Sequence, residues 1–366
     1  NFIINTLKAL LFKIAIFQNS TFNITRFIIL RGLGILYSIA FIITINQFPA
    51  LAGDNGLLPT PLFFQKLNSY FPSTIEGFFN LPSLFWWNNS ETFIIFVSWV
   101  GLILSILIAI GLTNALACFL IWFFYLSIIN AGQLFYGFGW ESLLLETTFL
   151  CIFLCPIRDW HPFPKNHKPP KIIIFLLLWL LFRNMFGAGL IKIRGDQSWR
   201  DLTTLFYFFE TQPLPNPLSP FFHNLPQFIL KTGVFFNHIS ELIIPFLLFG
   251  SQKFRRLSEL IIILFQSTLI ISGNLSFLNY LTILNCFASF NDNDYKQIIS
   301  KLPIKTIKHK ITQYITTYEK QESNSKHNSK HNLSTSQLIT LTLLTVLISI
   351  LSIKPILNLI NPKQIM

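Results

Sequence analysis

The sequence predicts an all-α, polytopic helical membrane protein with about eight or nine transmembrane helices and a cytoplasmic N-terminus. Hydrophobic residues make up 52% of the 366 residues and charged residues only 11%, whereas soluble domains carry about a quarter charged residues. The mean hydropathy is +0.55. Several runs reach the roughly 20 apolar residues that a bilayer-spanning helix needs. Lys and Arg also gather in alternate loops, which gives the orientation.

The apolar runs define the elements in order. Residues 1–24 contain Lys8 and Lys13 among apolar residues, which is typical of an interfacial amphipathic helix. The chain begins at Asn1 and shows no signal-peptide pattern, so we expect the first span to act as a signal anchor. The short sequences GLTN and SGN divide two of the longer runs into hairpins. The predicted spans are 27–47, 93–112, 114–136, 141–157, 171–191, 234–250, 257–272, 275–290 and 338–360.

The distribution of basic residues predicts the orientation and excludes a nucleic-acid partner. With the N-terminus in the cytoplasm, the cytoplasmic segments hold 19 Lys and Arg and the principal outer segments hold five. Cytoplasmic loops attract these residues in this way, so the formal charge of +12 is a topology signal. The Lys, Asn and Ser residues of 291–336 predict a cytoplasmic linker. A final transmembrane helix follows within 337–366.

The same threading brings four polar and aromatic segments, 132–141, 192–233, 235–241 and 272–280, to the outer face. We expect their charged residues to form ion pairs and hydrogen bonds at the membrane surface. Their aromatic residues either contact a partly folded client or lie in the headgroup belt. The QPLPNPLSP run predicts an extended strap, because residues before proline avoid the α region. The candidate outer-face cluster comprises Trp140, Glu141, Lys192, Arg194, Asp196, Trp199, Arg200, Asp201, Tyr207, Glu210, His238, Glu241 and Asn274.

Glu146 and Arg183 lie well inside predicted spans, where an unpaired charge costs several kcal/mol. Glu146 and Arg183 are therefore predicted to form an interhelical ion pair, unless they have a direct functional role. Gly187–Gly189 and the glycines of LRGLG are expected to let a second helix approach closely. His238 and Glu241 lie on one helix face, either as a hydrogen-bonded pair or as metal ligands, but no further ligand stands at metal-binding spacing. We predict no catalytic residue, metal or cofactor.

Six motifs in order resemble the lipase maturation factor family. They are TRFIILRGLGILYSIAF, ALAGDNGLLP, GQLFYGFGWESLLLETTFL, the segment from FGAGLIKIRGDQSWRDL through LPNPLSP, NHISELIIPFLLF and LIISGNLSFLNYLTIL. The resemblance covers residues 25–290 as a transmembrane domain. It implies a protein of the endoplasmic-reticulum membrane, or of the inner membrane in a bacterium, that assists the folding and assembly of secreted lipases. Family members continue into an outer domain implicated in client binding, where this chain has its linker and final span.

Two functions follow from this resemblance. The first is a non-catalytic maturation factor for exported lipase-like or other secreted proteins, with the lipid bilayer and client proteins as partners. The family is also distantly similar to the membrane region of vitamin K-dependent γ-carboxylase. The alternative is therefore a membrane enzyme that acts on a lipid or quinone-like substrate at the outer face, with a desolvated Lys or Glu as base.

Overall fold

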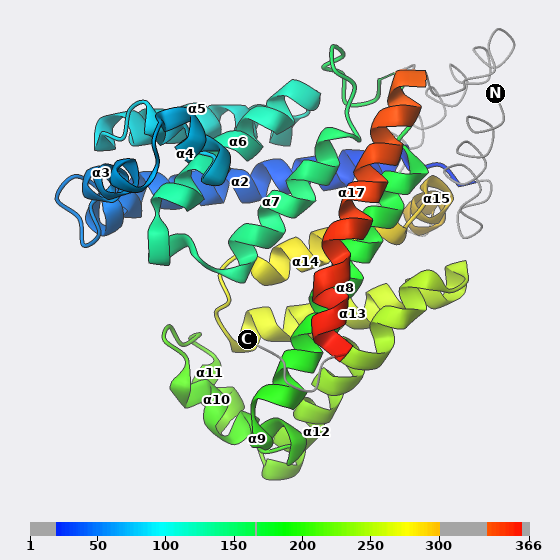
Figure 1. The fold of residues 1–366 in the computed structure, drawn as a ribbon. Helices are drawn as coiled ribbons and strands as arrows, with labels where there is room; N and C mark the ends of the chain where they lie inside the picture. The colour runs from blue at the N-terminus through cyan, green and yellow to red at the C-terminus, as the bar shows by residue number, and fades with distance from the viewer. Residues whose placement is uncertain (1–19, 165–166, 301–334, 361–366) are drawn as a thin grey trace, which may run out of the picture. The chain divides into compact units, whose positions relative to one another are not determined.

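The computed structural model describes residues 20–164, 167–300 and 335–360, and the regular elements in these ranges are helices (Figure 1). In chain order the elements are α2 (Asn23–Ala52), α3 (Thr60–Tyr70), α4 (Thr74–Asn80), η2 (Leu84–Trp86), α5 (Glu91–Ile110), α6 (Ala115–Ala131), η3 (Gln133–Tyr136), α7 (Gly139–Ile152), α8 (Lys171–Gly195), α9 (Gln197–Arg200), α10 (Leu205–Thr211), α11 (Ser219–His223), α12 (Gln227–His238), η4 (Ile239–Ile243), η5 (Ile244–Phe249), α13 (Gln252–Ser272), α14 (Leu278–Cys286), η6 (Phe287–Ser289), α15 (Asp292–Ser300) and α17 (Thr335–Ile360).

Within the described residues, five helices are long and apolar enough to cross a membrane. They are Asn23–Ala52, Glu91–Ile110, Lys171–Gly195, Gln227–Phe249 and Ser336–Asn358. The chain is thus a polytopic helical membrane protein, as predicted. The other predicted spans correspond to α6 with 17 residues, α7 with 14, α14 with nine, and α13, whose first turns are polar. The larger number of spans stays a prediction.

Two predicted segments lie largely outside the described ranges. The interfacial helix at 1–24 is described only from residue 20, and the linker only up to residue 300 and from residue 335. The first residues of that linker form the helix α15 (Asp292–Ser300), in which Asp292, Asp294 and Tyr295 are buried. The composition of this segment predicts a solvated linker and gives no sign of this burial, because the residues that contact Asp292 and Asp294 come from distant parts of the chain.

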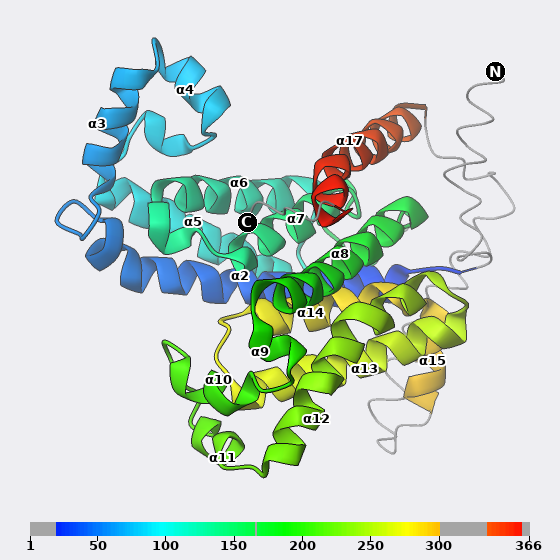
Figure 2. The same cartoon turned by 60° about the horizontal axis from the view of Figure 1, so that its bottom comes forward.

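The chain forms two compact units. Unit 1 comprises Asn1–Thr25, Lys168–Asn274 and Cys286–Met366, and unit 2 comprises Arg26–His167 and Leu275–Asn285. In unit 1, α8 packs against η4, η5 and α17, and the Trp179 indole donates to Ser352 Oγ at 3.3 Å. Figure 2 shows α9, α10 and α11 beside α12 at one end of this unit.

In unit 2, small residues allow α2 to lie directly against α5. A Cβ on Gly34 would lie 2.5 Å from the backbone nitrogen of Ala109, so only glycine fits there. The Ser38 and Ser105 hydroxyls share a hydrogen bond of 3.0 Å across the same contact. This bears out the close helix approach that LRGLG predicted.

The GLTN sequence ends one helix of unit 2 and begins the next, as predicted. Gly111 has a φ of +120° and its N–H bonds to the carbonyls of Leu107 and Ile108, which closes α5. Asn114 then accepts a hydrogen bond from the Ala117 N–H at 2.8 Å and caps α6. The α5–α6 hairpin is thereby defined by two residues with opposite roles.

Candidate functional site

The predicted outer-face residues of unit 1 gather where α8 ends beside α12. Lys192 lies in the last turn of α8, and its Nζ donates to Glu241 Oε1 at 2.6 Å and to Asn237 Oδ1 at 2.7 Å. Asn237 Nδ2 also donates to Glu241 Oε2 at 3.1 Å. Both carboxylate oxygens of Glu241 are therefore hydrogen-bonded, and its side chain is only 4% exposed against 25% for Lys192.

Aromatic rings surround the ammonium group of this pair. Lys192 Nζ lies 5.0 Å from the ring centroid of Trp199 and 5.8 Å from that of Phe265. Both distances are within the range in which a ring face attracts a cation. We call Lys192, Asn237, Glu241 and Trp199 the polar clasp, because they join α8, α9, α12 and η4.

The path of the backbone explains how Glu241 reaches α8. Pro245 has no N–H to offer the carbonyl four residues earlier, and the chain passes from α12 through the π-helical turn η4 into the 3₁₀ segment η5. A Cβ on Gly189 would lie 2.9 Å from the Cβ of Glu241 and 2.7 Å from Leu242 Cδ2. Gly189 therefore permits this approach, as predicted, whereas Gly187 faces open space.

Hydrogen bonds fix the chain after α8, as the charged residues there predicted. Asp196 Oδ1 accepts the Ser198 N–H at 2.7 Å and caps α9, and the hydrogen bonds from Ser198 hold the pKa of Asp196 below its ordinary value. Arg200 Nη1 donates to the carbonyl of Ile193 at 3.0 Å, and Gln197 Nε2 donates to Asp201 at 2.8 Å.

His238 also holds this turn, although not through Glu241. Its Nε2 lies 3.0 Å from the Trp199 carbonyl oxygen, and its ring lies 6.0 Å from the Trp199 ring. The side chains of the predicted pair thus make separate contacts, His238 with the Trp199 carbonyl oxygen and Glu241 with Lys192 and Asn237. Within the described residues, no three His, Cys, Asp or Glu side chains gather as a metal site requires.

We call residues 196–226, which follow α8, the outer module. Glu210 Oε1 lies 3.0 Å from His223 Nε2, and the rings of Phe209 and Phe222 stack at 5.9 Å, so α10 and α11 form a pair. The Tyr207 side chain is exposed.

The proline strap attaches the outer module to the end of α13. Asn216 Nδ2 donates to the carbonyls of Ile270 and Gly273 at 3.1 and 3.2 Å, and Ser219 Oγ donates to the Ser272 carbonyl at 3.0 Å. The Asn274 N–H donates to Gln212 Oε1 at 3.3 Å. Neighbouring backbone groups therefore fix the predicted strap, but it is extended only in part, because residues 217 and 218 form a turn and Ser219 begins α11.

In unit 2, the predicted residues Trp140 and Glu141 form a second buried polar site. The Trp140 indole donates to Glu141 Oε1 at 3.1 Å, and the Tyr125 hydroxyl on α6 donates to Glu141 Oε2. Trp140 also stacks on Phe138 at 4.5 Å. Glu141 is buried, so these donors replace the water that its carboxylate would otherwise bind.

The predicted site residues are therefore distributed over both units. Arg194 lies in the last turn of α8, next to the polar clasp in sequence. Glu146 lies in unit 2 and Arg183 in unit 1, so their predicted pairing stays a prediction. Sequence reasoning missed Asn237 and Tyr125, which donate hydrogen bonds to Glu241 and Glu141.

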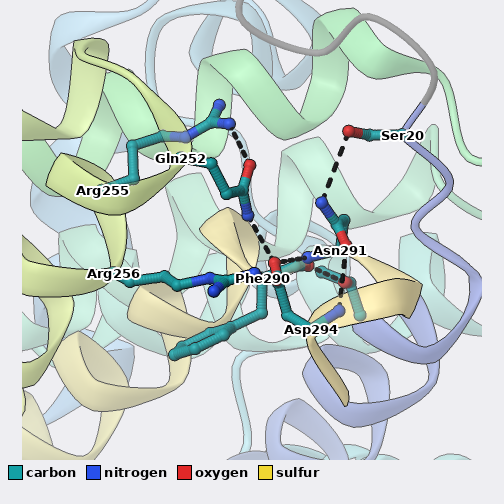
Figure 3. Close-up of polar contacts among 8 residues, drawn as sticks. Ser20, Gln252, Arg255, Arg256, Phe290, Asn291 and Asp294 are labelled. Atoms are coloured by element: carbon teal, nitrogen blue, oxygen red, sulfur yellow. Dashed lines mark hydrogen bonds and ion pairs between the residues drawn. The ribbon is translucent and has the colours of Figure 1, made fainter. Parts of the chain in front are cut away.

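A further polar cluster in unit 1 was also missed. Asp292 Oδ1 accepts the Ile24 N–H at 2.8 Å, and its Oδ2 accepts the Asn23 N–H at 3.1 Å, so Asp292 caps the start of α2 from a distant part of the chain. Asp294 accepts the Asn291 N–H at 2.9 Å. Figure 3 shows Asp294 joined to Gln252, with Arg256 reaching it from the same helix.

Comparison with known proteins finds, over most of the chain, the family that the six sequence motifs resemble. The model of the lipase maturation factor transmembrane domain matches residues 24–297. Lipase maturation factor 1 of Mus musculus is 37% identical over 355 residues, which cover 95% of this chain and 61% of the mouse protein. The human protein of the same name is 40% identical over 75% of this chain and 50% of its own length. Lipase maturation factor 2 of Xenopus tropicalis is 33% identical over 72% of the chain and 38% of its own length.

The match begins and ends close to the limits that the sequence motifs predicted, and it includes most of α15. The chain spans about three fifths of the mouse relative and half of the human one. No solved structure matches this chain. The six ordered motifs, the helical membrane architecture and these similarities agree, and the chain belongs to the lipase maturation factor family.

Proposed function

We propose that this chain acts as a non-catalytic maturation factor for secreted lipases in the endoplasmic-reticulum membrane and contacts its clients through the outer module. One observation carries this proposal. The module is held near its start by the polar clasp and again at the strap in its middle, and it still exposes large apolar side chains. These are Tyr207, Leu214, Leu218 and Phe221. A fixed apolar surface loses little conformational freedom when a partner binds, which suits the recognition of incompletely assembled proteins.

The proposed orientation places the N-terminus in the cytoplasm and the outer module in the lumen. The distribution of Lys and Arg supports it. The hairpins α6–α7 and α13–α14 each return the chain to the side from which it came. The side on which the outer module lies is therefore the same whether or not these two hairpins cross the membrane, so the orientation does not depend on a total of five or nine spans.

The contacts of Lys192 favour this function over a membrane enzyme. A lysine that acts as a base must be free to take a proton from the substrate. Lys192 donates to Glu241 and Asn237 and lies beside the Trp199 ring. These contacts use the ammonium group to join helices.

Photo-crosslinking tests the proposed contact with lipases. The chain is expressed in cells that lack their own lipase maturation factors, together with a secreted homodimeric lipase. A benzophenone amino acid replaces Tyr207 or Phe221 in the outer module, and in a matched control it replaces Leu260, an equally exposed apolar residue of α13. We expect lipase adducts from positions 207 and 221 and none from position 260.

The secretion of active lipase provides the second readout. We expect Tyr207→Ala/Phe221→Ala to reduce the specific activity of the secreted lipase while Leu260→Ala leaves it unchanged. Crosslinking yields that are equal at all three positions, together with unchanged secretion, would refute a role for the outer module.

A further inference from the structure

A second outer element, around α4 in unit 2, is joined to the ends of three long helices. At the end of α2, the Asp54 N–H donates to Glu91 Oε2 at 3.0 Å and the Glu91 N–H donates to Asp54 Oδ1 at 3.2 Å. Because Glu91 is the first residue of α5, the end of α2 and the start of α5 lie at one level. The Thr60 hydroxyl bonds to the Ala52 carbonyl at 2.7 Å, which attaches α3 at the same place.

The third helix end is that of α6. The N–H of Leu84 donates to Ser127 Oγ at 3.0 Å, and Ser83 Oγ donates to the Ser127 carbonyl at 3.2 Å. Asn130 Nδ2 donates to the Pro82 carbonyl at 2.7 Å. The segment after α4 is therefore bound to the last turn of α6, whose direction is opposite to that of α5.

An aromatic core makes this element rigid. Trp86 is buried and meets Phe64 and Phe71 edge to face at 5.2 and 5.9 Å. A Cβ on Gly77 of α4 would lie 2.4 Å from the Trp86 ring, so α4 lies directly on that ring. The depth of α4 relative to the three helix ends is thus fixed by packing and hydrogen bonds.

Three large apolar side chains beside this core are exposed, two on the opposite face of α4 and one directly after η2, and we call them the α4 patch. Ile75 and Phe79, one helical turn apart, are 65% and 78% exposed, and Trp87 is 63% exposed. The patch continues along α6, because Phe78 contacts Trp87 at 5.3 Å and Phe123 of α6 at 6.2 Å. Phe123 in turn stacks at 6.0 Å on Phe119, an exposed residue of the same apolar helix.

We propose that the α4 patch lies in the interfacial layer of the lipid bilayer, in the leaflet at which α5 begins. Trp87 stands four residues before Glu91, where α5, a helix long enough to span the membrane, starts. Residues 56–90 contain one Lys and one Glu, so the element carries no net charge. Aromatic residues favour this depth, where their rings meet both acyl chains and headgroups. Burial of the patch adds an in-plane anchor beside the spans.

Spin labelling locates the patch relative to the membrane. All four native cysteines are buried, so a single introduced cysteine provides a specific attachment point. The full chain with Phe79→Cys or Trp87→Cys is reconstituted in phosphatidylcholine nanodiscs and labelled with a nitroxide. Lys66→Cys on α3 is the matched control, since Lys66 is exposed and charged. Collisions with oxygen and with a water-soluble nickel chelate are measured by power saturation.

We expect the labels at 79 and 87 to meet oxygen more often than the nickel chelate, and the label at 66 to show the reverse. Labels at 79 and 87 that are as accessible to the chelate as the label at 66 would overturn the proposal and leave the patch as a surface for a soluble partner. Spin–spin broadening between two copies in one disc would overturn it in favour of self-association. The two positions are independent, so a folding defect in one variant leaves the other as the test.

Discussion

A double-mutant cycle across Lys192 and Glu241 tests whether the polar clasp holds the outer module. Glu241→Gln keeps the shape of the side chain but removes its charge, and Lys192→Met keeps much of the length of the side chain but removes the ammonium group. The combined variant removes both charges. In the wild type, the two groups lie 2.6 Å apart and Glu241 is almost fully buried.

The structure sets the expected magnitudes. Removal of one member of a buried ion pair leaves the other charge without compensation and costs about 3–5 kcal/mol. We expect Lys192→Met to lie at the upper end, because Glu241 is the more deeply buried partner. We expect the loss of stability from Glu241→Gln to be at the lower end of this range, because the amide oxygen of the new side chain and Asn237 still accept hydrogen bonds from Lys192. The double variant should be more stable than the sum of the two losses predicts by about 1–3 kcal/mol.

A thiol-reactive fluorogenic dye provides the assay. Cys118, Cys151, Cys155 and Cys286 are buried and react only when the helices separate, so dye fluorescence reports unfolding in mixed micelles of increasing denaturing detergent. The control is Glu210→Gln, which removes the charge from a Glu side chain that is 65% exposed and should cost less than about 1 kcal/mol. Additive losses from the two clasp variants would refute the assignment of Lys192 and Glu241 as one coupled unit.

Two further predictions concern other parts of the molecule. Asp292→Ala removes the carboxylate that caps the start of α2, so we expect a loss of about 1–2 kcal/mol and faster hydrogen exchange at the Asn23 and Ile24 amides; unchanged exchange there would contradict the cap. Burial and the neighbouring Arg26 lower the pKa of His167 to about 4, below the value of about 6.5 in an unfolded chain. The folded state thus takes up the proton less readily than the unfolded state, so stability should be complete above pH 6.5 and fall as the pH drops toward 4. His167→Gln should flatten this dependence in melting curves, and an unaltered pH profile would count against it.

Features that depend on neighbouring residues in the chain could be predicted from the sequence. The break between α5 and α6 follows from Gly111 and Asn114, whose residue types suit a helix end and a helix start. The strap follows from three closely spaced prolines. The close helix contact at Gly189 could be predicted from its small side chain. A Cβ added to Gly187 in the same motif would have no neighbour within 4 Å. A small-residue motif indicates that helices meet and does not specify which of its residues lies at the contact.

Features that depend on contacts between distant segments could not be predicted. Asp292 lies at the start of a segment with many Lys, Asn and Ser residues, and only its contact with residues 23 and 24, some 270 positions away, explains its burial. An apolar run can also overestimate helix length, as in α7. The predicted span 141–157 contains Pro156, but α7 ends at Ile152. The chain turns after this residue, and the Pro156 carbonyl accepts a hydrogen bond from the Ala115 N–H at the start of α6.

Glu241 and Glu141, two of the buried glutamates in the described residues, show where reasoning from energetic cost succeeds and where it fails. A carboxylate in an apolar environment must find donors, so Glu241 and Glu141 could be identified as site residues before their partners were known. Asn237 precedes Glu241 by four residues in an apolar stretch, and residues at this spacing face each other on a helix. That partner could have been inferred from the sequence. The hydroxyl that reaches Glu141 comes from Tyr125 on the preceding helix, and no spacing rule relates the two positions. A search for donors at helical spacing around each buried acid would therefore recover the local half of such a site, and the other half depends on how the helices pack.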